Sequence, residues 1–170
     1  MKNVFLGIGT NLGKRENNLD AAIKRVEENI GPVLKYSSIY ETEPWGFKAE
    51  DQFLNLVIMV KTDLRPSVLL EQILKIEYSL GRVRSTERYS SRLIDIDILL
   101  YEDIIVDSQN LKIPHPLLHE RRFVLVPLCE IAPDLIHPIL NKSVAMLLEI
   151  CEDKSKVLKY AKTARPQDLL

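Results

Sequence analysis

This sequence of 170 residues has little cysteine, few aromatic side chains and no long apolar run. Its two cysteines, Cys129 and Cys151, form no CxxC pair and are too few for a disulfide framework, which favours a reducing compartment. The apolar run Val4–Gly9 is too short for the core of a signal peptide, and no stretch approaches the ~18 residues of a membrane span. These absences predict a cytoplasmic protein with no membrane partner.

An excess of charge of either sign is also missing. With 23 basic and 24 acidic residues, the formal net charge is −1. Domains that bind nucleic acid usually carry a clear basic excess, so the balance predicts no nucleic-acid partner. The basic residues gather locally instead, which suits a small polyanion. The length predicts a single domain over residues 1–170, and no feature indicates an obligate protein partner.

The most informative segment, Gly81–Ile98, contains this local cluster. Four arginines fall within eleven residues: Arg82, Arg84, Arg88 and Arg92. Arginine binds phosphate oxygens through a planar fork of N–H donors. Asp95 and Asp97 follow in alternation with isoleucines, which is typical of a strand with both carboxylates on one face. Two such carboxylates repel each other unless a divalent cation binds beside them. The segment predicts a site for a magnesium-bound polyphosphate, with a solvated sheet face as the alternative.

Hydrophobic periodicity predicts the element order β-α-β-β-α-β, the split βαβ or ferredoxin-like arrangement. The predicted elements are a strand Asn3–Gly9, a helix from Leu19 to Ile30, strands Val33–Tyr40 and Phe53–Val60, a helix from Pro66 to Leu80, and a strand Leu93–Tyr101. Polar loops are expected at Thr42–Gln52 and Gly81–Arg92. An added hairpin, with strands Ile104–Val106 and Leu111–Ile113, and a mostly helical C-terminal part complete an α+β fold.

Two further patterns match no standard motif in their spacing. The run Gly7–Arg15 fits neither a Walker loop nor a dinucleotide fingerprint, and it is expected to shape a tight strand-to-helix turn. His115 and His119 stand four apart, as zinc ligands can, but prolines flank the first of them. A histidine on such a rigid turn can instead donate to a phosphate.

Asn55 interrupts the otherwise apolar strand Phe53–Val60. A buried amide costs free energy unless it is paired, so Asn55 either satisfies neighbouring backbone or binds a ligand. Phe53 lies on the same face two residues earlier. An aromatic ring beside an amide can stack a flat heterocycle and bind its edge.

Together these residues resemble the 6-hydroxymethyl-7,8-dihydropterin pyrophosphokinase family, whose members move pyrophosphate from ATP to a pterin alcohol in folate biosynthesis and release AMP. The resemblance covers most of the chain. It rests on the segments Gly9–Gly13, Glu41–Gly46, Phe53–Asn55, Gly81–Arg84, Arg92–Asp97, Pro114–Pro116, Arg121–Phe123 and Pro127–Pro133. It implies a ferredoxin-like fold, in agreement with the predicted element order.

The resemblance also implies roles for particular residues. Asp95 and Asp97 would hold two Mg²⁺ ions, and Arg82 and Arg92 would act with them in catalysis. The residues implied to bind ATP are Arg82, Arg84, Tyr89, Arg92, Ile98, His115 and Arg121. Those implied to bind the pterin are Thr42, Trp45, Phe53, Asn55 and Phe123. Positions that differ from common family residues are Glu43, Leu74 and Tyr89.

A non-catalytic nucleotide- or RNA-binding module is the competing hypothesis, because ferredoxin-like sheets also serve RNA recognition. It requires an aromatic strand of the RNP type, which the sequence lacks. It also gives Asp95 and Asp97 no purpose, because paired carboxylates repel a phosphate backbone in the absence of metal. The catalytic interpretation is therefore preferred.

Overall fold

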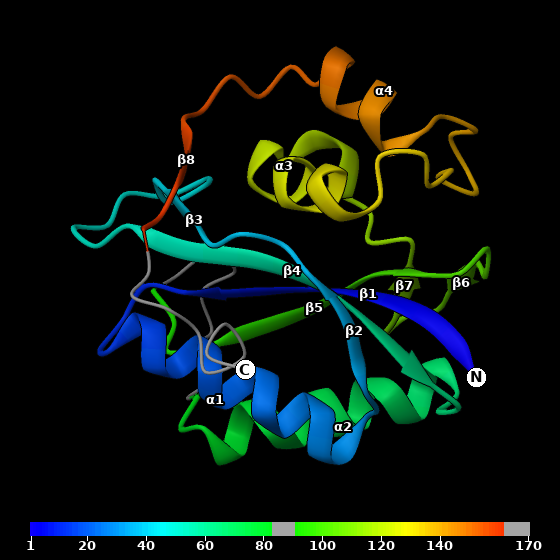
Figure 1. Cartoon of the computed structure of the whole chain (residues 1–170), viewed down its shortest axis with the longest axis horizontal. Helices are drawn as coiled ribbons and strands as arrows, with labels where there is room; N and C mark the ends of the chain where they lie inside the picture. The colour runs from blue at the N-terminus through cyan, green and yellow to red at the C-terminus, as the bar shows by residue number, and fades with distance from the viewer. Residues whose placement is uncertain (83–90, 162–170) are drawn as a thin grey trace.

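The structure is a computed structural model that describes residues 1–82 and 91–161, and its central feature is one six-stranded antiparallel sheet (Figure 1). The strands are β1 (Lys2–Thr10), β2 (Val33–Tyr36), β3 (Tyr40–Thr42), β4 (Phe53–Thr62), β5 (Asp95–Tyr101) and β8 (Val157–Lys159). Their order is β5-β1-β4-β3-β8, and β2 also pairs with β4. This arrangement confirms the predicted ferredoxin-like α+β fold, with β5 at one edge.

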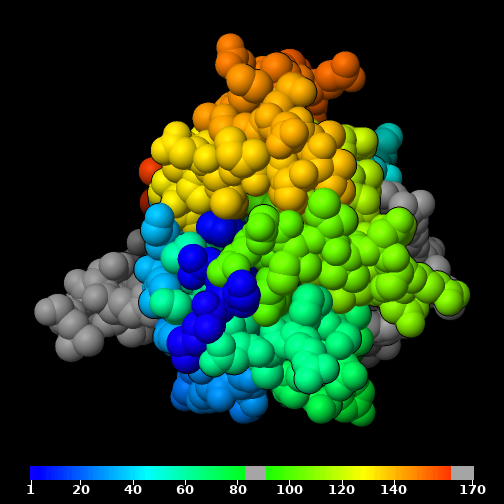
Figure 2. All heavy atoms as spheres, turned by 90° about the vertical axis from the view of Figure 1, so that its right-hand side faces the viewer, coloured from blue at the N-terminus to red at the C-terminus, as the bar shows by residue number. Residues whose placement is uncertain are grey.

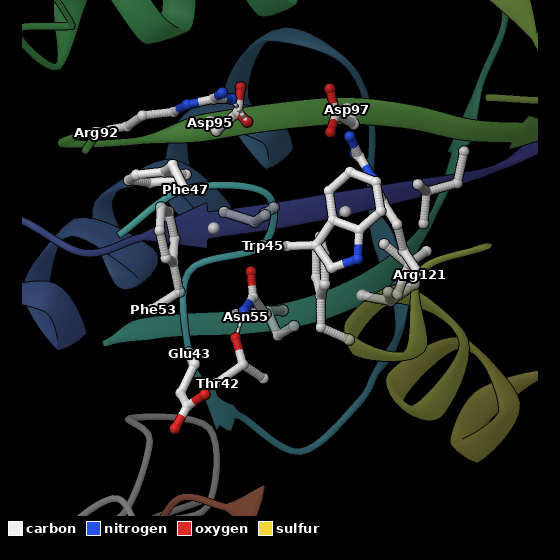
Figure 3. Close-up of a pocket in the computed structure, with 18 residues that line it drawn as sticks. Thr42, Glu43, Trp45, Phe47, Phe53, Asn55, Arg92, Asp95, Asp97 and Arg121 are labelled. Carbon is white, nitrogen blue, oxygen red and sulfur yellow. Dashed lines mark hydrogen bonds and ion pairs between the residues drawn. The ribbon is translucent and has the colours of Figure 1, made fainter. Parts of the chain in front are cut away.

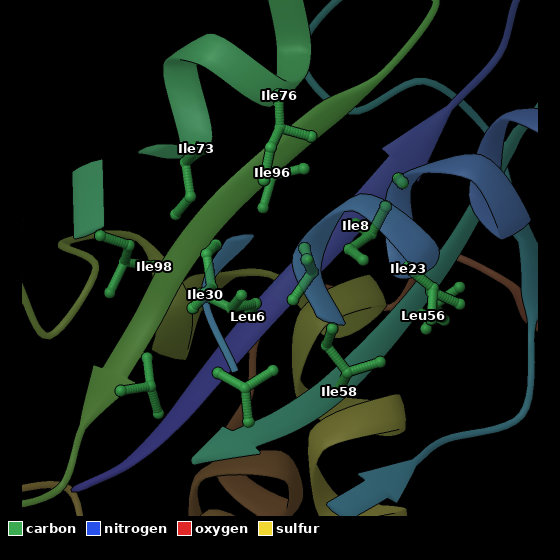
Figure 4. Packing of buried hydrophobic residues seen from close by; sticks show 14 of the residues in the cluster. Leu6, Ile8, Ile23, Ile30, Leu56, Ile58, Ile73, Ile76, Ile96 and Ile98 are labelled. Atoms are coloured by element: carbon green, nitrogen blue, oxygen red, sulfur yellow. The ribbon is translucent and has the colours of Figure 1, made fainter. Parts of the chain in front are cut away.

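Two helices, α1 (Arg15–Asn29) and α2 (Pro66–Ser79), cover one face of the sheet (Figure 1). Pro66 occupies the first position of α2, where its missing N–H leaves no intrahelical bond unmade. Alternate residues of the strands meet the apolar stripes of both helices, because successive strand side chains point to opposite faces. Figure 4 shows this core, which includes Leu6 and Ile8 of β1, Leu56 and Ile58 of β4, Ile96 and Ile98 of β5, Ile23 of α1, and Ile73 and Ile76 of α2.

The opposite face is covered by α3 (Arg122–Ile131) and α4 (Val144–Ile150), which follow a short 3-10 helix, Leu118–Glu120. Phe5, Val57 and Leu99 of the strands pack against Leu125 and Leu128 of α3. The predicted hairpin forms from β6 (Val106–Asp107) and β7 (Lys112–Ile113). In Figure 2 this hairpin region lies directly above α2, and the layer of α3 and α4 lies above the strands.

The predicted strand Val33–Tyr40 is divided in the structure. At the break, Ser38 donates its main-chain N–H and its hydroxyl to the carboxylate of Glu130 in α3, at 2.9 and 2.7 Å. Because this N–H is used outside the sheet, the ladder with β4 is interrupted and resumes at Tyr40. The sequence-based prediction missed this contact, which joins residues 92 positions apart.

The C-terminal part is less helical than predicted, because β8 adds to the sheet beside β3. β8 has only three residues, of which Leu158 is 62% exposed, so it lacks the alternation that marks a longer strand. The segments 83–90 and 162–170 lie outside the described residues, and the single domain over residues 1–170 stays a prediction. No helix within the described ranges is long and apolar enough to cross a membrane.

Candidate active site

The register of three strands creates a trough on the face that α3 and α4 leave partly open. Gly9 of β1 pairs with Asp95 of β5 on one side and Asn55 of β4 on the other. Gly7 likewise lies between Asp97 and Val57. Both glycines lie within β1, as in the predicted strand Asn3–Gly9, and the turn to α1 follows at residues 11–14 and contains Gly13 alone of the glycines expected to shape it.

The absence of a side chain at Gly9 is what keeps the trough open. A Cβ atom at this position would approach Oδ1 of Asn55 to 2.8 Å, which is closer than real contacts allow. Any other residue would therefore displace the amide. The carboxylates of β5 and the amide of β4 consequently face each other across a strip of bare backbone, which can accommodate a flat ligand between them.

A cavity occupies this trough between the sheet, the N-terminal end of α3 and the segment 43–52 (Figure 3). The residues that line it include five predicted to bind the pterin, namely Thr42, Trp45, Phe53, Asn55 and Phe123. Four of the predicted phosphate and metal residues line it as well: Arg92, Asp95, Asp97 and Arg121. The fold thus brings together predicted residues that lie up to 81 positions apart, from Thr42 to Phe123.

At one end of the cavity, charged side chains neutralise one another. Arg82 contacts Oδ1 of Asp95 at 2.8 Å and also pairs with Glu77, and Arg92 pairs with Oδ2 of Asp95. Burial, with the nearby charge of Asp95, raises the pKa of Asp97 to about 7, although Arg121 and Arg92 oppose the shift. The negative charge on Asp97 is therefore costly here, and a cation beside it would lower that cost.

Glu77 also belongs to this network, although the sequence did not single it out. Its side chain is almost fully buried, and one carboxylate oxygen accepts the main-chain N–H of Ile96 at 2.8 Å. Burial raises the pKa of Glu77, and the charge of Arg82 opposes the rise. A signal was available, because Glu77 stands four residues after Ile73 in the buried stripe of α2, where a charge requires a partner.

The other end of the cavity is neutral and aromatic. Nδ2 of Asn55 donates to Oγ1 of Thr42 at 2.7 Å, and both side chains are buried. The amide carbonyl is the atom that lies beside Gly9 at the floor of the trough. The ring of Phe47 meets that of Phe53 edge-on, with centroids 6.1 Å apart. This end therefore offers an aromatic wall and an oriented amide to a heterocycle.

Trp45 and Arg121 stand between the two ends. Figure 3 shows the indole of Trp45 within the cavity, between Asp97 and Asn55. The guanidinium of Arg121 lies 4.7 Å from the centroid of this indole and 5.7 Å from that of Phe123. Nε of Arg121 is buried and has no hydrogen-bond partner among the described residues. Such an orphaned donor is costly, and an acceptor on a bound ligand would satisfy it.

Among the other predicted residues within the described ranges, Arg82, Ile98 and His115 do not line the cavity. Nδ1 of His115 accepts the N–H of Leu117 at 3.1 Å, and burial, aided by the charge of Arg121, lowers the pKa of His115 to about 4. The ring of His119, the other candidate zinc ligand, lies against that of His137, with centroids 6.3 Å apart. No cluster of three potential metal-ligating side chains occurs in the described ranges.

The side chain of Ile98 belongs to the core beneath α1 and α2, on the face opposite Asp97. Arg84 and Tyr89 lie outside the described residues. A second groove runs between α2 and the hairpin, and its lining includes Leu70, Leu74 and Leu111.

Arginines and carboxylates at one end of a cavity, with aromatic rings and an oriented amide at the other, are the attributes of a phosphotransferase that acts on a flat acceptor. Comparison with known proteins identifies the family within this class. The sequence model of 7,8-dihydro-6-hydroxymethylpterin-pyrophosphokinase matches residues 5–133, and the chain belongs to this family. It is therefore an ATP-dependent pyrophosphokinase, not a non-catalytic module.

Individual relatives agree with this assignment. The chain is 44% identical over 142 residues to a 2-amino-4-hydroxy-6-hydroxymethyldihydropteridine pyrophosphokinase of Aquifex aeolicus, covering 84% of this chain and 88% of that one. It is also 44% identical over 137 residues to the enzyme of the same name from Methylorubrum extorquens, covering 80% and 86%. Both relatives are matched over most of their length, so the family assignment does not rest on a fragment.

Solved structures support the fold. A Plasmodium falciparum HPPK-DHPS triple mutant with STZ-DHP aligns with a TM-score of 0.72 at 19% identity. The alignment covers 87% of this chain and only 43% of that one, so the chain spans less than half the length of this neighbour.

Proposed function

We propose that this protein transfers pyrophosphate from ATP to the hydroxymethyl group of 6-hydroxymethyl-7,8-dihydropterin and releases AMP. The observation that carries the proposal is the register that sets Asp95, Gly9 and Asn55 side by side on three strands. A substrate lying over Gly9 would have its ring edge at the amide and its reactive group directed toward the carboxylate and arginine end. The acceptor and the phosphates would therefore meet above β1.

The pterin would be held at the neutral end. Its ring would stack on Phe53 and Phe123, and its edge would hydrogen-bond to Asn55, whose amide is oriented by Thr42. The indole of Trp45 lies in this space, so the ring must turn aside as the pterin enters (Figure 3). Trp45 is the only tryptophan in the chain, so its fluorescence reports on that movement.

The charged end has the donor set that Mg²⁺ requires. Asp95 and Asp97 present hard oxygen atoms on one strand face, and the raised pKa of Asp97 marks a negative charge without adequate compensation. Magnesium commonly binds one or two carboxylates together with substrate phosphates, so these two residues would hold the two proposed ions. Bound Mg²⁺ would neutralise triphosphate charge and stabilise the departing AMP oxygen.

The chain's own residues supply the remaining contributions. Arg82 and Arg92 would exchange their pairs with Asp95 for the phosphates, and Nε of Arg121 would gain the acceptor that it lacks. The guanidinium groups would stabilise charge as it redistributes over the transferred pyrophosphate. Because the pterin and the transferred phosphates would share one trough, much of the rate enhancement would come from holding the acceptor oxygen near the β-phosphorus.

The nucleoside of ATP would occupy the groove between α2 and the hairpin. Ile98 lies on the edge strand β5, where the N–H of Ile96 points outward to Glu77. Residues two apart in a strand have the same main-chain direction, so the main chain of Ile98 also faces outward, toward a base in this groove. His115, neutral at pH 7 and with Nδ1 already bonded, would donate through Nε2 to a phosphate. Arg84 and Tyr89 stay predicted ATP contacts.

We also propose that the enzyme works in the cytoplasm on these two small molecules, with no obligate protein or nucleic-acid partner. Cys129 and Cys151 are both free thiols, as a reducing compartment maintains. The near balance of charge supports a small-molecule substrate.

Product analysis of a single turnover tests the reaction. Protein, Mg²⁺, ATP and the pterin alcohol should give AMP and pterin pyrophosphate in equal amounts, resolved by chromatography. Omission of Mg²⁺, or replacement of the acceptor by 6-methyl-7,8-dihydropterin, should abolish AMP formation. ADP as the product would make the protein an ordinary kinase and contradict the proposal.

A further inference from the structure

Asn11, the first residue after β1, joins two segments that are distant in sequence. Its side chain is 1% exposed. Oδ1 accepts the main-chain N–H of Arg92 at 2.7 Å, while Nδ2 donates to Oγ of Ser91 at 3.0 Å and to the carbonyl of Asp51 at 3.3 Å. The main-chain N–H of Asn11 also donates to the carbonyl of Arg92, at 3.0 Å.

The two segments that meet at Asn11 lead to opposite ends of the cavity. Asp51 stands two residues before Phe53, which lines the pterin end. Arg92 itself lines the charged end and pairs with Asp95. A single buried amide therefore connects the main chain behind the stacking residue to the main chain of a phosphate-binding arginine.

Two neighbouring residues, Arg15 and Asn18, each form hydrogen bonds to only one of these two segments. Arg15 donates from Nη1 to the carbonyl of Gln52 at 2.7 Å and pairs with Glu41 at 2.9 Å, so it holds only the pterin side. Asn18 donates to the carbonyl of Leu93 at 3.2 Å and holds only the arginine side. Of the described residues in the turn and first helical turn, Asn11 alone forms hydrogen bonds to both segments.

We propose that Asn11 is a positioning residue that couples nucleotide binding at one end of the cavity to pterin binding at the other; this inference rests on the proposed function. A shift of the main chain of Ser91 and Arg92, as Arg92 exchanges Asp95 for the phosphates, would move Asn11 through the bonds to its Oδ1 and Nδ2. The bond from Nδ2 to Asp51 transmits that shift to the segment before Phe53. Asparagine supplies both the acceptor for the N–H of Arg92 and the donor to the carbonyl of Asp51. An aspartate of the same length would keep the acceptor but, as a carboxylate, could not donate.

The coupling is measured as a ratio of affinities. The Kd of the pterin alcohol is determined by calorimetry with and without Mg²⁺ and α,β-methylene-ATP, which cannot be cleaved at the bond that breaks. We expect about tenfold or greater enhancement of pterin binding by the nucleotide in the wild-type protein. The same factor must appear in the nucleotide affinity with and without pterin, because equilibrium coupling is reciprocal.

Asn11→Asp keeps the size and the acceptor but places an oxygen against the carbonyl of Asp51. The coupling factor should fall by about tenfold, the usual effect of losing a buried hydrogen bond. Ser91→Ala removes only the hydroxyl that receives Nδ2 and leaves the buried amide in place, so it serves if Asn11→Asp does not fold. Its coupling factor should fall by about threefold.

Two control variants distinguish a loss of coupling between the ligands from a general loss of ligand affinity. Arg15→Gln should weaken pterin binding equally with and without nucleotide and keep the coupling factor, because Arg15 holds one segment only. Asn29→Asp makes the same chemical change on the exposed end of α1 and should alter nothing.

The outcomes are distinguishable. A coupling factor of one in the wild-type protein, or an unchanged factor in Asn11→Asp and Ser91→Ala while both ligands still bind, overturns the role of Asn11. An equal loss of coupling in Arg15→Gln also overturns it. Failure of the wild-type protein to bind either ligand overturns the proposed function itself, and the coupling with it.

Discussion

The two ends of the cavity are stabilised in opposite ways. At the charged end, Arg82 and Arg92 form ion pairs with Asp95, and in the proposed mechanism these ion pairs would be exchanged for contacts with the phosphates. At the neutral end, the hydrogen bond between Asn55 and Thr42 is already made, so the amide is oriented before the ligand arrives. We infer that variants at the charged end change mainly the chemical step, whereas variants at the neutral end change mainly affinity.

The largest expected effect is at the carboxylates. Asp97→Ala, or Asp95→Ala, should lower turnover by at least about 10³-fold, since the proposed ligands for Mg²⁺ are lost. The fold should persist, because Asp97 contributes a buried charge whose removal relieves repulsion with Asp95. Steady-state assays across a Mg²⁺ titration, with circular dichroism to verify folding, measure this. Near-normal magnesium-dependent activity would remove the carboxylates from the mechanism.

Substitution of the arginines tests whether the charged end acts mainly on the chemical step. Arg92→Ala should slow the single-turnover rate by about 10²–10³-fold while weakening ATP binding much less, because charge stabilisation is greatest in the transition state. Arg82→Ala should act similarly but also destabilise the fold, since it leaves Glu77 buried without its cation.

Rapid-quench kinetics with calorimetric ATP binding separates the two quantities for both arginine variants. Arg25→Ala, on the exposed side of α1, is the matched control. A loss confined to ATP affinity would mean that these arginines only bind the ground state.

At the neutral end the effect should be on affinity. Asn55→Ala and Phe123→Ala should each weaken pterin binding by up to about 3 kcal/mol, through loss of an edge hydrogen bond or one stacking face. The affinity of the ATP analogue should change little in comparison. Quenching of Trp45 fluorescence measures pterin entry, and calorimetry checks it. Equal losses for both ligands would show that the two ends are not functionally separate.

The same comparison explains what the sequence could predict. The charged end is encoded locally, because alternation alone places Asp95 and Asp97 on one face of β5. Long apolar runs such as Phe53–Val60 also identified the central strands. Patterns within one segment were therefore sufficient for the element order and for Asp95, Asp97, Phe53 and Asn55, whereas Thr42, Trp45, Arg121 and Phe123 came only from the family resemblance.

Features that depend on pairing between segments were not predictable. The role of Gly9 follows from its register between Asp95 and Asn55, which no local pattern specifies. Glu77 acts on the main chain of Ile96, 19 positions away, and Asn11 joins partners 40 and 81 positions away. Such contacts are set by the packed fold, so the residues that connect the two ends emerged only from the structure.

His115 gives the smallest expected effect, and it tests whether the charged end contains a neutral donor. Its pKa of about 4 lies below the value of 6.5 for an unfolded chain, so the unfolded state binds more protons between these values. The contribution of His115 to the free energy of unfolding is therefore fully present above pH 6.5 and is lost as the pH falls toward 4. At pH 5 the loss is about 2 kcal/mol relative to pH 7.

His115→Asn keeps an acceptor for the N–H of Leu117 but does not titrate, so its free energy of unfolding should lack this dependence on pH. Urea unfolding of both proteins at pH 7 and pH 5 measures the difference, and parallel changes in the two would show that His115 is already protonated at pH 5 in the folded state.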